Sequence, residues 1–246
     1  MKSIKLARIT SFISLLLFPI TLNFFSPYVS IVGAFNGIVN GSVMLFGFML
    51  LSAMFFRRAW CTYVCPVSAI SEFGERVNSK RLKRKPLTWI RLSIFGLWFS
   101  ILIFGFITAN GIHAFIPLFM TESGISVDQP LKFLTYYLVL SSLVILTFSL
   151  GKRGACYSIC WMSPFLSAGA WFGDKLHFPQ YKVRSTPETC IKCTLCDKNC
   201  PMSLDVMEEL KAGSIQSLDC IQCGRCVEVC PKDVLRIGFK NSRNKK

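Results

Sequence analysis

Long apolar runs alternate with short polar segments over the first two thirds of the chain. A helix needs about 17–25 apolar residues to cross the hydrocarbon core of a bilayer, which is roughly 30 Å thick. Four runs reach that length and predict an α-helical membrane protein with four spanning helices: Ile9–Phe25, Ile31–Phe56, Trp89–Ala109 and Phe133–Leu150. The first run follows a basic start but no convincing cleavage site, so we interpret it as an uncleaved helix.

Composition agrees with a membrane protein. The chain has 246 residues, of which 52% are hydrophobic and only 17% are charged, too apolar for an ordinary soluble domain. The formal net charge of +15 lies mostly between and after the apolar runs. The segment between the second and third runs is rich in Lys and Arg, whereas 110–130 carries only Glu122 and Asp128 as charged residues. The positive-inside rule then predicts an inner-membrane protein with both termini in the cytoplasm.

The most basic stretch is Lys80–Lys85, in which only Leu82 is uncharged. Such a run binds either nucleic acid or anionic lipid. A basic segment next to a membrane helix gains about 1 kcal/mol per charge at an anionic leaflet. We therefore expect the lipid bilayer as its partner, and no nucleic acid.

An internal repeat emerges when the sequence is shifted by 95 residues: Arg58-Ala-Trp-Cys61-x-x-x-Cys65 then overlays Arg153-Gly-Ala-Cys156-x-x-x-Cys160. Each copy holds two apolar runs followed by a cysteine pair, so the two copies run in the same direction. The expected fold is a four-helix bundle built from two parallel two-helix repeats. Their pseudo-two-fold axis would lie along the membrane normal and bring the cysteine pairs together.

Each cysteine pair has the spacing i, i+4, which places both thiols on one face of a helix. A helix N-terminus and a nearby arginine, Arg58 or Arg153, would make these thiols more acidic. Cys61, Cys65, Cys156 and Cys160 are therefore candidate redox or catalytic residues, as a further iron site, a dithiol couple or a transient assembly site. Four small buried hydrophobic side chains are the plainer alternative. After Cys65, the apolar spacing of 66–77 predicts a short helix on the cytoplasmic membrane surface.

The remaining eight cysteines form two runs, Cys190-x-x-Cys193-x-x-Cys196-x-x-x-Cys200-Pro201 and Cys220-x-x-Cys223-x-x-Cys226-x-x-x-Cys230-Pro231. This is the spacing of bacterial two-cluster ferredoxins, in which the fourth cysteine of each run binds the other cluster. Zinc sites use cysteine pairs but not this doubled pattern. We expect two [4Fe–4S] clusters with crossed ligand sets: Cys190, Cys193, Cys196 and Cys230 for one, and Cys220, Cys223, Cys226 and Cys200 for the other.

The domain boundaries follow from these patterns. We expect a transmembrane domain over 1–178, a linker over 179–189, a small α+β two-cluster ferredoxin-like domain over 190–240 and a basic tail over 241–246. His113 lies just past the third apolar run and is a candidate proton acceptor from a quinol, although a polar anchor at the interface is the commoner role. His177 falls at the end of the first domain and carries little information.

Together, the four spans, the C-x-x-x-C pairs and the terminal ferredoxin module resemble the NapH family of ferredoxin-type membrane subunits. Cys61, Cys65 and Pro66 match the family's first C-x-x-x-C-P motif, and Cys156 and Cys160 match the second, where Trp161 replaces the proline. The resemblance implies a quinol-dehydrogenase-type subunit with quinone as substrate and a redox protein as partner. Two alternatives stay open: a metal-handling or assembly reductase, such as the copper-reducing relatives of similar motif, and a structural anchor for a redox complex.

Overall fold

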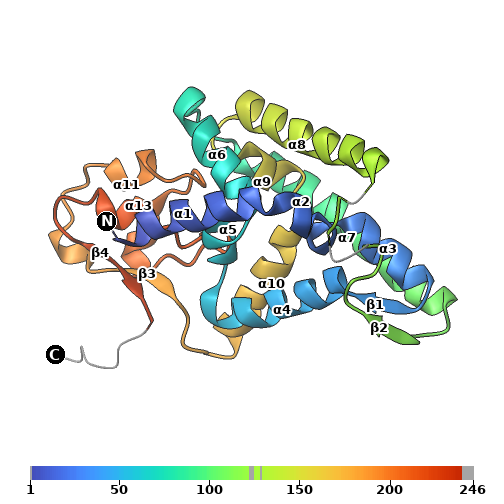
Figure 1. The fold of residues 1–246 in the computed structure, drawn as a ribbon. Coiled ribbons are helices and arrows are strands. Elements are labelled where there is room, and N and C mark those ends of the chain that lie inside the picture. Colours follow the sequence, from blue (N-terminus) through green and yellow to red (C-terminus); the bar gives the residue numbers. More distant parts are fainter. Residues whose placement is uncertain (1, 122–124, 128, 240–246) are drawn as a thin grey trace.

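A computed structural model describes residues 2–121, 125–127 and 129–239 of the chain. This part is mostly helical, with two small two-stranded sheets. The ferredoxin-like module lies at one end, on the left of Figure 1, and the strands β1 and β2 lie at the other. The membrane half contains α1 (Lys2–Leu16), α2 (Phe18–Thr21), η1 (Leu22–Phe25), α3 (Pro27–Phe35), β1 (Ile38–Asn40), α4 (Gly41–Phe56), α5 (Trp60–Tyr63), α6 (Pro66–Val77), α7 (Arg84–Thr108), β2 (Ala114–Ile116), α8 (Pro130–Leu150), α9 (Gly154–Ser158) and α10 (Met162–Lys175).

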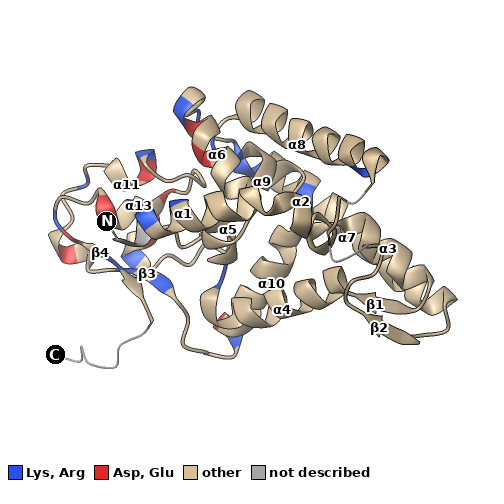
Figure 2. Ribbon diagram, viewed as in Figure 1, with Lys and Arg blue, Asp and Glu red and all other residues tan. Residues whose placement is uncertain are grey.

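Two described helices, α7 and α8, are long and apolar enough to cross a membrane. Ile4–Leu16 and Phe18–Phe25 pass the same test together, with a bend of 64° between them, so up to three spans are present by length and composition. Figure 2 shows that charged residues gather over the module and its junction with the membrane half, while α3, β1 and β2 are almost free of them. Charged residues are thus unevenly distributed along the described structure.

The expected second span, Ile31–Phe56, is not one continuous helix. The chain leaves α3 after Phe35, forms β1 and re-enters a helix as α4. Gly37 takes a left-handed conformation with φ of 65°, and β1 pairs in parallel with β2, from Ile38 opposite Ala114. The Asn40 side chain accepts a bond from Val43 N and donates one to Val29 O, so it starts α4 and ties it to α3.

The two halves of the repeat pack on each other reciprocally. Helix α6 of the first copy lies against α8 of the second, where a Cβ on Gly74 would come within 2.5 Å of Thr147. Helix α10 of the second copy lies against α4 of the first, where a Cβ on Gly169 would come within 2.2 Å of the Leu50 carbonyl oxygen. The two glycines are equivalent in the repeat, so the same close approach is used twice.

The helix expected after Cys65 forms as α6, with Pro66 in its first turn. It buries Ile70 and Gly74 against the neighbouring helices but leaves Phe73 63% and Val77 67% exposed. An amphipathic helix with large apolar side chains on its outer face suits the surface of a bilayer.

The ferredoxin-like module begins earlier than the sequence indicated. Within the expected linker, β3 (Lys182–Ser185) pairs antiparallel with β4 (Leu235–Gly238), so that part of 179–189 belongs to the module. Val183 is buried in the module core, and its carbonyl accepts a bond from Ile215 N. The other module elements are η2 (Pro187–Thr189), α11 (Leu195–Lys198), α12 (Val206–Glu209), η3 (Leu210–Ala212) and α13 (Arg225–Glu228). The tail over 241–246 lies outside the described residues.

The basic stretch Lys80–Lys85 lies against the module. Arg81 and Arg84 both pair with Asp205, at 2.8 and 3.1 Å. The Leu82 amide donates to the Ser203 hydroxyl, and Lys152 N donates to the Lys80 carbonyl. This stretch therefore contacts protein, and its contact with anionic lipid stays a prediction.

Candidate functional site

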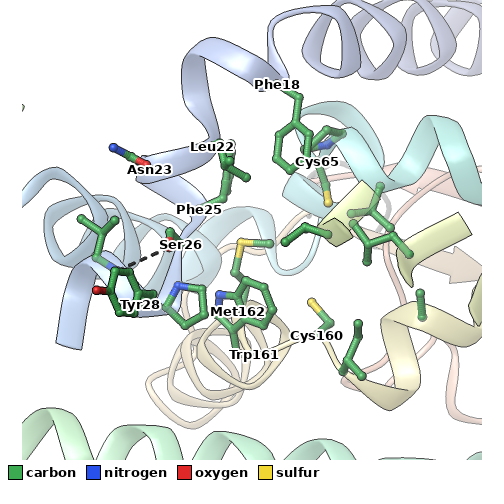
Figure 3. Close-up of a pocket in the computed structure, with 18 of the residues that line it drawn as sticks. Phe18, Leu22, Asn23, Phe25, Ser26, Tyr28, Cys65, Cys160, Trp161 and Met162 are labelled. Carbon is green, nitrogen blue, oxygen red and sulfur yellow. Dashed lines mark hydrogen bonds between the residues drawn. The ribbon is translucent and has the colours of Figure 1, made fainter. Parts of the chain in front are cut away.

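The four cysteines of the repeat line one apolar cavity of ≈ 280 Å³. Cys61 lies on α5, Cys65 precedes α6, Cys156 lies on α9 and Cys160 precedes α10. Cys65 and Cys160 are drawn with their neighbours in Figure 3. The shift of 95 residues relates the two pairs in sequence, and the structure brings them to the same place.

The rest of the cavity wall comes from helices of both copies. Phe18, Leu22 and Phe25 contribute from the bent N-terminal segment, as Figure 3 shows, and Met49 contributes from α4. Leu143 of α8 and the pair Met162 and Leu166 of α10 complete the apolar lining. Polar groups are few and include Asn23, Ser126 and Lys132. Such a lining suits a largely apolar ligand with a few polar atoms.

Two of the thiols that line this cavity, Cys65 and Cys160, are less acidic than the sequence suggested. Burial raises the pKa of the Cys65 thiol well above its usual value and raises that of Cys160 to about 12. Neighbouring cysteines add to both shifts, and the lowering effect of Arg58 on Cys160 is smaller than the desolvation effect. Cys65 and Cys160 are therefore neutral thiols at pH 7 unless a bound metal displaces their protons or an oxidant removes their electrons.

The four repeat cysteines do not form a preformed site for a single metal ion. Among residues 2–121, 125–127 and 129–239, no group of three or more Cys, His, Asp or Glu side chains is close enough to hold one. A cubane cluster needs a wider spacing of thiols, because each cysteine binds a different iron atom. The repeat cysteines consequently form a thiol-lined cavity rather than a preformed one-ion site.

Two buried arginines and a partly buried aspartate connect the cavity to the module. Arg58, which lines the cavity and is 1% exposed, donates to the Asp219 carboxylate at 2.7 Å. Arg91 donates to the same carboxylate at 3.1 Å, and its guanidinium carbon lies 5.5 Å from the centre of the Tyr157 ring. Burial alone would raise the pKa of Asp219, but Arg58 and Arg91 together hold it below its usual value. The carboxylate is therefore ionised at neutral pH.

The sequence did not single out this cluster. From the sequence, Arg58 is expected to make the cysteine thiols more acidic, and Arg91 counts only toward the positive-inside charge. The repeat places an arginine three residues before the first cysteine of each pair. The equivalent Arg153 is also buried and donates to the Cys61 carbonyl and to the Ser68 hydroxyl. That repeated arginine was the available signal for a buried structural role.

Four of the ferredoxin cysteines lie around one small cavity. Cys190, Cys193, Cys196 and Cys230 line this cavity of ≈ 20 Å³, closed by side chains such as Leu210 and Leu235. Burial raises the pKa of the Cys226 thiol, and the neighbouring Cys223, Cys220, Cys200 and Cys196 add to that rise. Four thiols around an apolar space are the donor set that a [4Fe–4S] cluster takes.

Burial raises the pKa of Cys200 to about 11 and that of Cys220 to about 12. These thiols would hold their protons at pH 7 in the absence of iron. Iron binding must therefore release protons, and the bound clusters would supply one-electron transfer.

The module and the cavity share a wall at α5. The Thr62 hydroxyl donates to the Ile221 carbonyl at 2.6 Å in a buried contact, next to Cys220. The neighbouring Cys61 packs both against the module core and against the core of the membrane half. Arg57 donates to the Gln216 and Ser217 carbonyls in the same loop. The cysteine cavity and one cysteine group of the module are thus separated by little more than α5.

His113 lies elsewhere in the fold. It precedes β2, its side chain is exposed, and its Nε2 bonds to the Ala109 carbonyl oxygen. It is not among the residues that line the cysteine cavity. His177 follows α10 in a left-handed turn with φ of 57° and is exposed. Neither histidine contributes to the thiol-lined cavity.

Comparison with known proteins agrees with this arrangement. Residues 189–235 match a family model described as a 4Fe-4S dicluster domain, and residues 39–85, which include Cys61 and Cys65, match one described as a 4Fe-4S binding domain. The chain is 26% identical over 213 residues to YccM of Escherichia coli (strain K12), which covers 83% of this chain but 57% of YccM. No solved structure matches the chain.

Two further relatives match most of the chain. The ferredoxin-type protein NapH of Escherichia coli (strain K12) is 24% identical over 220 residues, 86% of this chain and 73% of NapH. Protein RdxA of Cereibacter sphaeroides is 24% identical over 207 residues, 74% of this chain and 42% of RdxA. The two iron–sulfur domain matches and these relatives support a NapH-type ferredoxin-like family, and they make the chain similar to iron–sulfur electron-transfer proteins.

Proposed function

We propose that this protein exchanges electrons between the membrane quinol pool and a redox partner protein, in the manner of a quinol-dehydrogenase subunit. The observation that carries the proposal is the shared wall between the apolar cavity and the ferredoxin-like module. Thr62 touches the loop that carries Cys220, and the adjacent Cys61 lines the cavity. A quinone ring reaching the cavity from lipid would lie close to the module without leaving the membrane half.

Each cysteine group would hold one [4Fe–4S] cluster: Cys190, Cys193, Cys196 and Cys230 the first, and Cys220, Cys223, Cys226 and Cys200 the second. The chain's own part is to hold these carriers, exclude water and fix the distance to the cavity. Cys61, Cys65, Cys156 and Cys160 would form the cavity wall that contacts the quinone. Oxidation of one quinol releases two electrons and two protons, and two one-electron carriers together accept both electrons.

The proposal includes a topology with four membrane crossings and both termini in the cytoplasm. Helices α7 and α8 provide two crossings, and the bent N-terminal pair provides a third. Helix α4 has 16 residues, about 24 Å at 1.5 Å per residue, so it needs the α3–β1 segment to complete a fourth. The reciprocal packing of α6 on α8 and of α10 on α4 supports this arrangement.

The test uses anaerobic vesicles that contain the purified protein. A reduced quinol analogue is added, and cluster absorbance and EPR are followed; the reverse experiment starts from reduced clusters and oxidised quinone. We expect exchange in at least one direction. For a one-electron step, each ~59 mV of difference between the two reduction potentials shifts the equilibrium constant tenfold. Absence of exchange in both directions, with the partner protein also present, would remove the quinone proposal.

A metal-handling reductase is the second candidate, and one observation favours it. Met49 and Met162 line the same cavity as the four cysteines, and soft sulfur ligands select metals such as Cu(I). Copper-dependent reoxidation of reduced clusters in the same vesicles would support it. Clusters inert to both quinone and copper would favour a structural anchor instead.

A further inference from the structure

We propose that the two cysteine groups of the module have different positions in the electron path. Cys200, Cys220, Cys223 and Cys226, here called the inner set, face the membrane half and exchange electrons with it. Cys190, Cys193, Cys196 and Cys230, here called the outer set, exchange electrons with the redox partner at the surface. This inference rests on the proposed function and adds the order in which the two clusters pass electrons. The two motifs have the same cysteine spacing, so the sequence does not indicate that order.

The hydrogen bonds that cross from the membrane half end close to the inner set. Arg58 and Arg91 bind Asp219, and Thr62 binds Ile221, which are the residues on either side of Cys220. The Tyr157 hydroxyl donates to the Met202 carbonyl at 2.9 Å, two residues from Cys200.

A second group of crossing contacts has the same target. The Lys152 ammonium group donates to the Cys200 carbonyl at 3.4 Å and also to that of Lys198. Arg225, which precedes Cys226, pairs with Glu75 of α6. These contacts approach the inner set from α6, from α9 and from the turn before α9, so the set is enclosed on its membrane side.

The outer set has the opposite surroundings. The cavity that its four thiols line is bounded by residues between Cys190 and Leu235 alone, with no residue of the described membrane half among them. Cys193 is exposed, and its neighbours Ile191 and Leu195 are 57% and 38% exposed. In the inner set, Cys200, Cys220 and Cys226 are buried at 7%, 8% and 7% exposure.

Because electron tunnelling slows steeply with distance, these positions fix the order of transfer. The inner set is the one next to Cys61 and the cavity, and the outer set is the one that an approaching protein can reach. A path that began at the outer set would have to pass over the inner set to reach the membrane half.

The first experiment compares Cys193→Ser with Cys223→Ser, which change the same position of each motif. Dithionite reduction and EPR establish which cluster each variant retains. With a quinol analogue in anaerobic vesicles, Cys193→Ser should still show reduction of the remaining inner cluster. In Cys223→Ser, quinol reduction of the remaining outer cluster should slow by about tenfold or more, although dithionite still reduces it. The reverse pattern would overturn the proposed order.

The second experiment needs neither variants nor quinol. The oxidised wild-type protein is treated with an iron chelator, the freed thiols are alkylated at intervals, and the labelled cysteines are mapped by peptide mass spectrometry. The outer-set cysteines should be labelled first. Simultaneous or inner-first labelling would contradict the placement, even if both variants above failed to fold. If wild-type clusters never respond to quinol but the labelling order holds, the quinone proposal fails and the placement of the two sets stands.

Discussion

At the scale of single residues, charge burial is the main feature that the sequence concealed. Arg58, Arg91 and Asp219 look like ordinary topological or surface charges in the chain, yet they meet at the junction between the two halves. An isolated buried charge is very unfavourable, so such groups persist only when they are paired and hydrogen-bonded. Their cluster therefore favours this placement of the module, because Asp219 binds both guanidinium groups.

This cluster gives a residue-scale prediction. Asp219→Asn should destabilise the protein by about 3–5 kcal/mol, because it leaves two buried arginines without their carboxylate. Asp205→Asn is the matched control: its partner Arg81 is 43% exposed and Asp205 itself 53%, so the loss should stay below about 1 kcal/mol. Thermal unfolding of both variants in the same detergent measures the difference. An equal loss of stability in both variants would show that the buried environment of Asp219 does not strengthen its ion pairs.

The cavity thiols give a second residue-scale prediction. Replacing Cys61, Cys65, Cys156 and Cys160 by Ser should leave about eight irons per chain and both ferredoxin EPR signals, since the described residues form no one-ion site there. Reduction by quinol should slow by roughly tenfold, about 1.4 kcal/mol of barrier, because the cavity wall becomes more polar. Iron analysis and stopped-flow absorbance test the two parts. A variant with clearly less iron per chain than the wild-type protein would show that the cavity cysteines hold iron.

At the scale of elements, apolar run length predicted helices well and helix continuity poorly. The third and fourth runs form α7 and α8 with boundaries shifted by at most five residues. The second run contains Asn36, Gly37 and Asn40, and there the chain turns into β1. Hydrophobicity reports whether a segment suits lipid, but a left-handed glycine and an asparagine N-cap decide where a helix stops and starts.

The close packing of α10 on α4 gives an element-scale prediction. Gly169→Ala should destabilise the protein by about 1–3 kcal/mol, because the new Cβ would lie 2.2 Å from the Leu50 carbonyl oxygen and the helices must separate. Gly47→Ala on α4 is the control, since its Cβ would meet nothing within 4 Å and alanine favours a helix by up to about 1 kcal/mol. Unfolding in bicelles compares them. A neutral Gly169→Ala would contradict the close approach.

At the scale of the whole molecule, the module is part of one packed structure with the membrane half. Arg57, Thr62, Arg81 and Tyr157 all bond to module carbonyls. A flexible linker would leave the distance between cavity and clusters undefined. Here α5 is shared between both cores through Cys61, so that distance is set by packing.

The topology is tested at this scale. A reporter fused after Lys246 should be active only in a cytoplasmic form, and one inserted after Thr121 only in an exported form, because Lys and Arg concentrate on the module's side. Alkaline phosphatase and a fluorescent protein serve as the paired reporters. Activity of the exported reporter at Lys246 would place the module outside and contradict the cytoplasmic assignment.

The sequence by itself determined the membrane class, the two ferredoxin motifs and the repeat, because run length, cysteine spacing and self-similarity are local properties of the chain. It also predicted α6 from apolar periodicity. Only the tertiary structure decided that Cys200, Cys220 and Cys226 are buried, that burial raises the pKa of the Cys65 and Cys160 thiols, and that the expected linker holds β3. These outcomes depend on desolvation and on contacts between residues far apart in the sequence, such as Thr62 with Ile221 and Ser185 with Leu235, which no local pattern encodes.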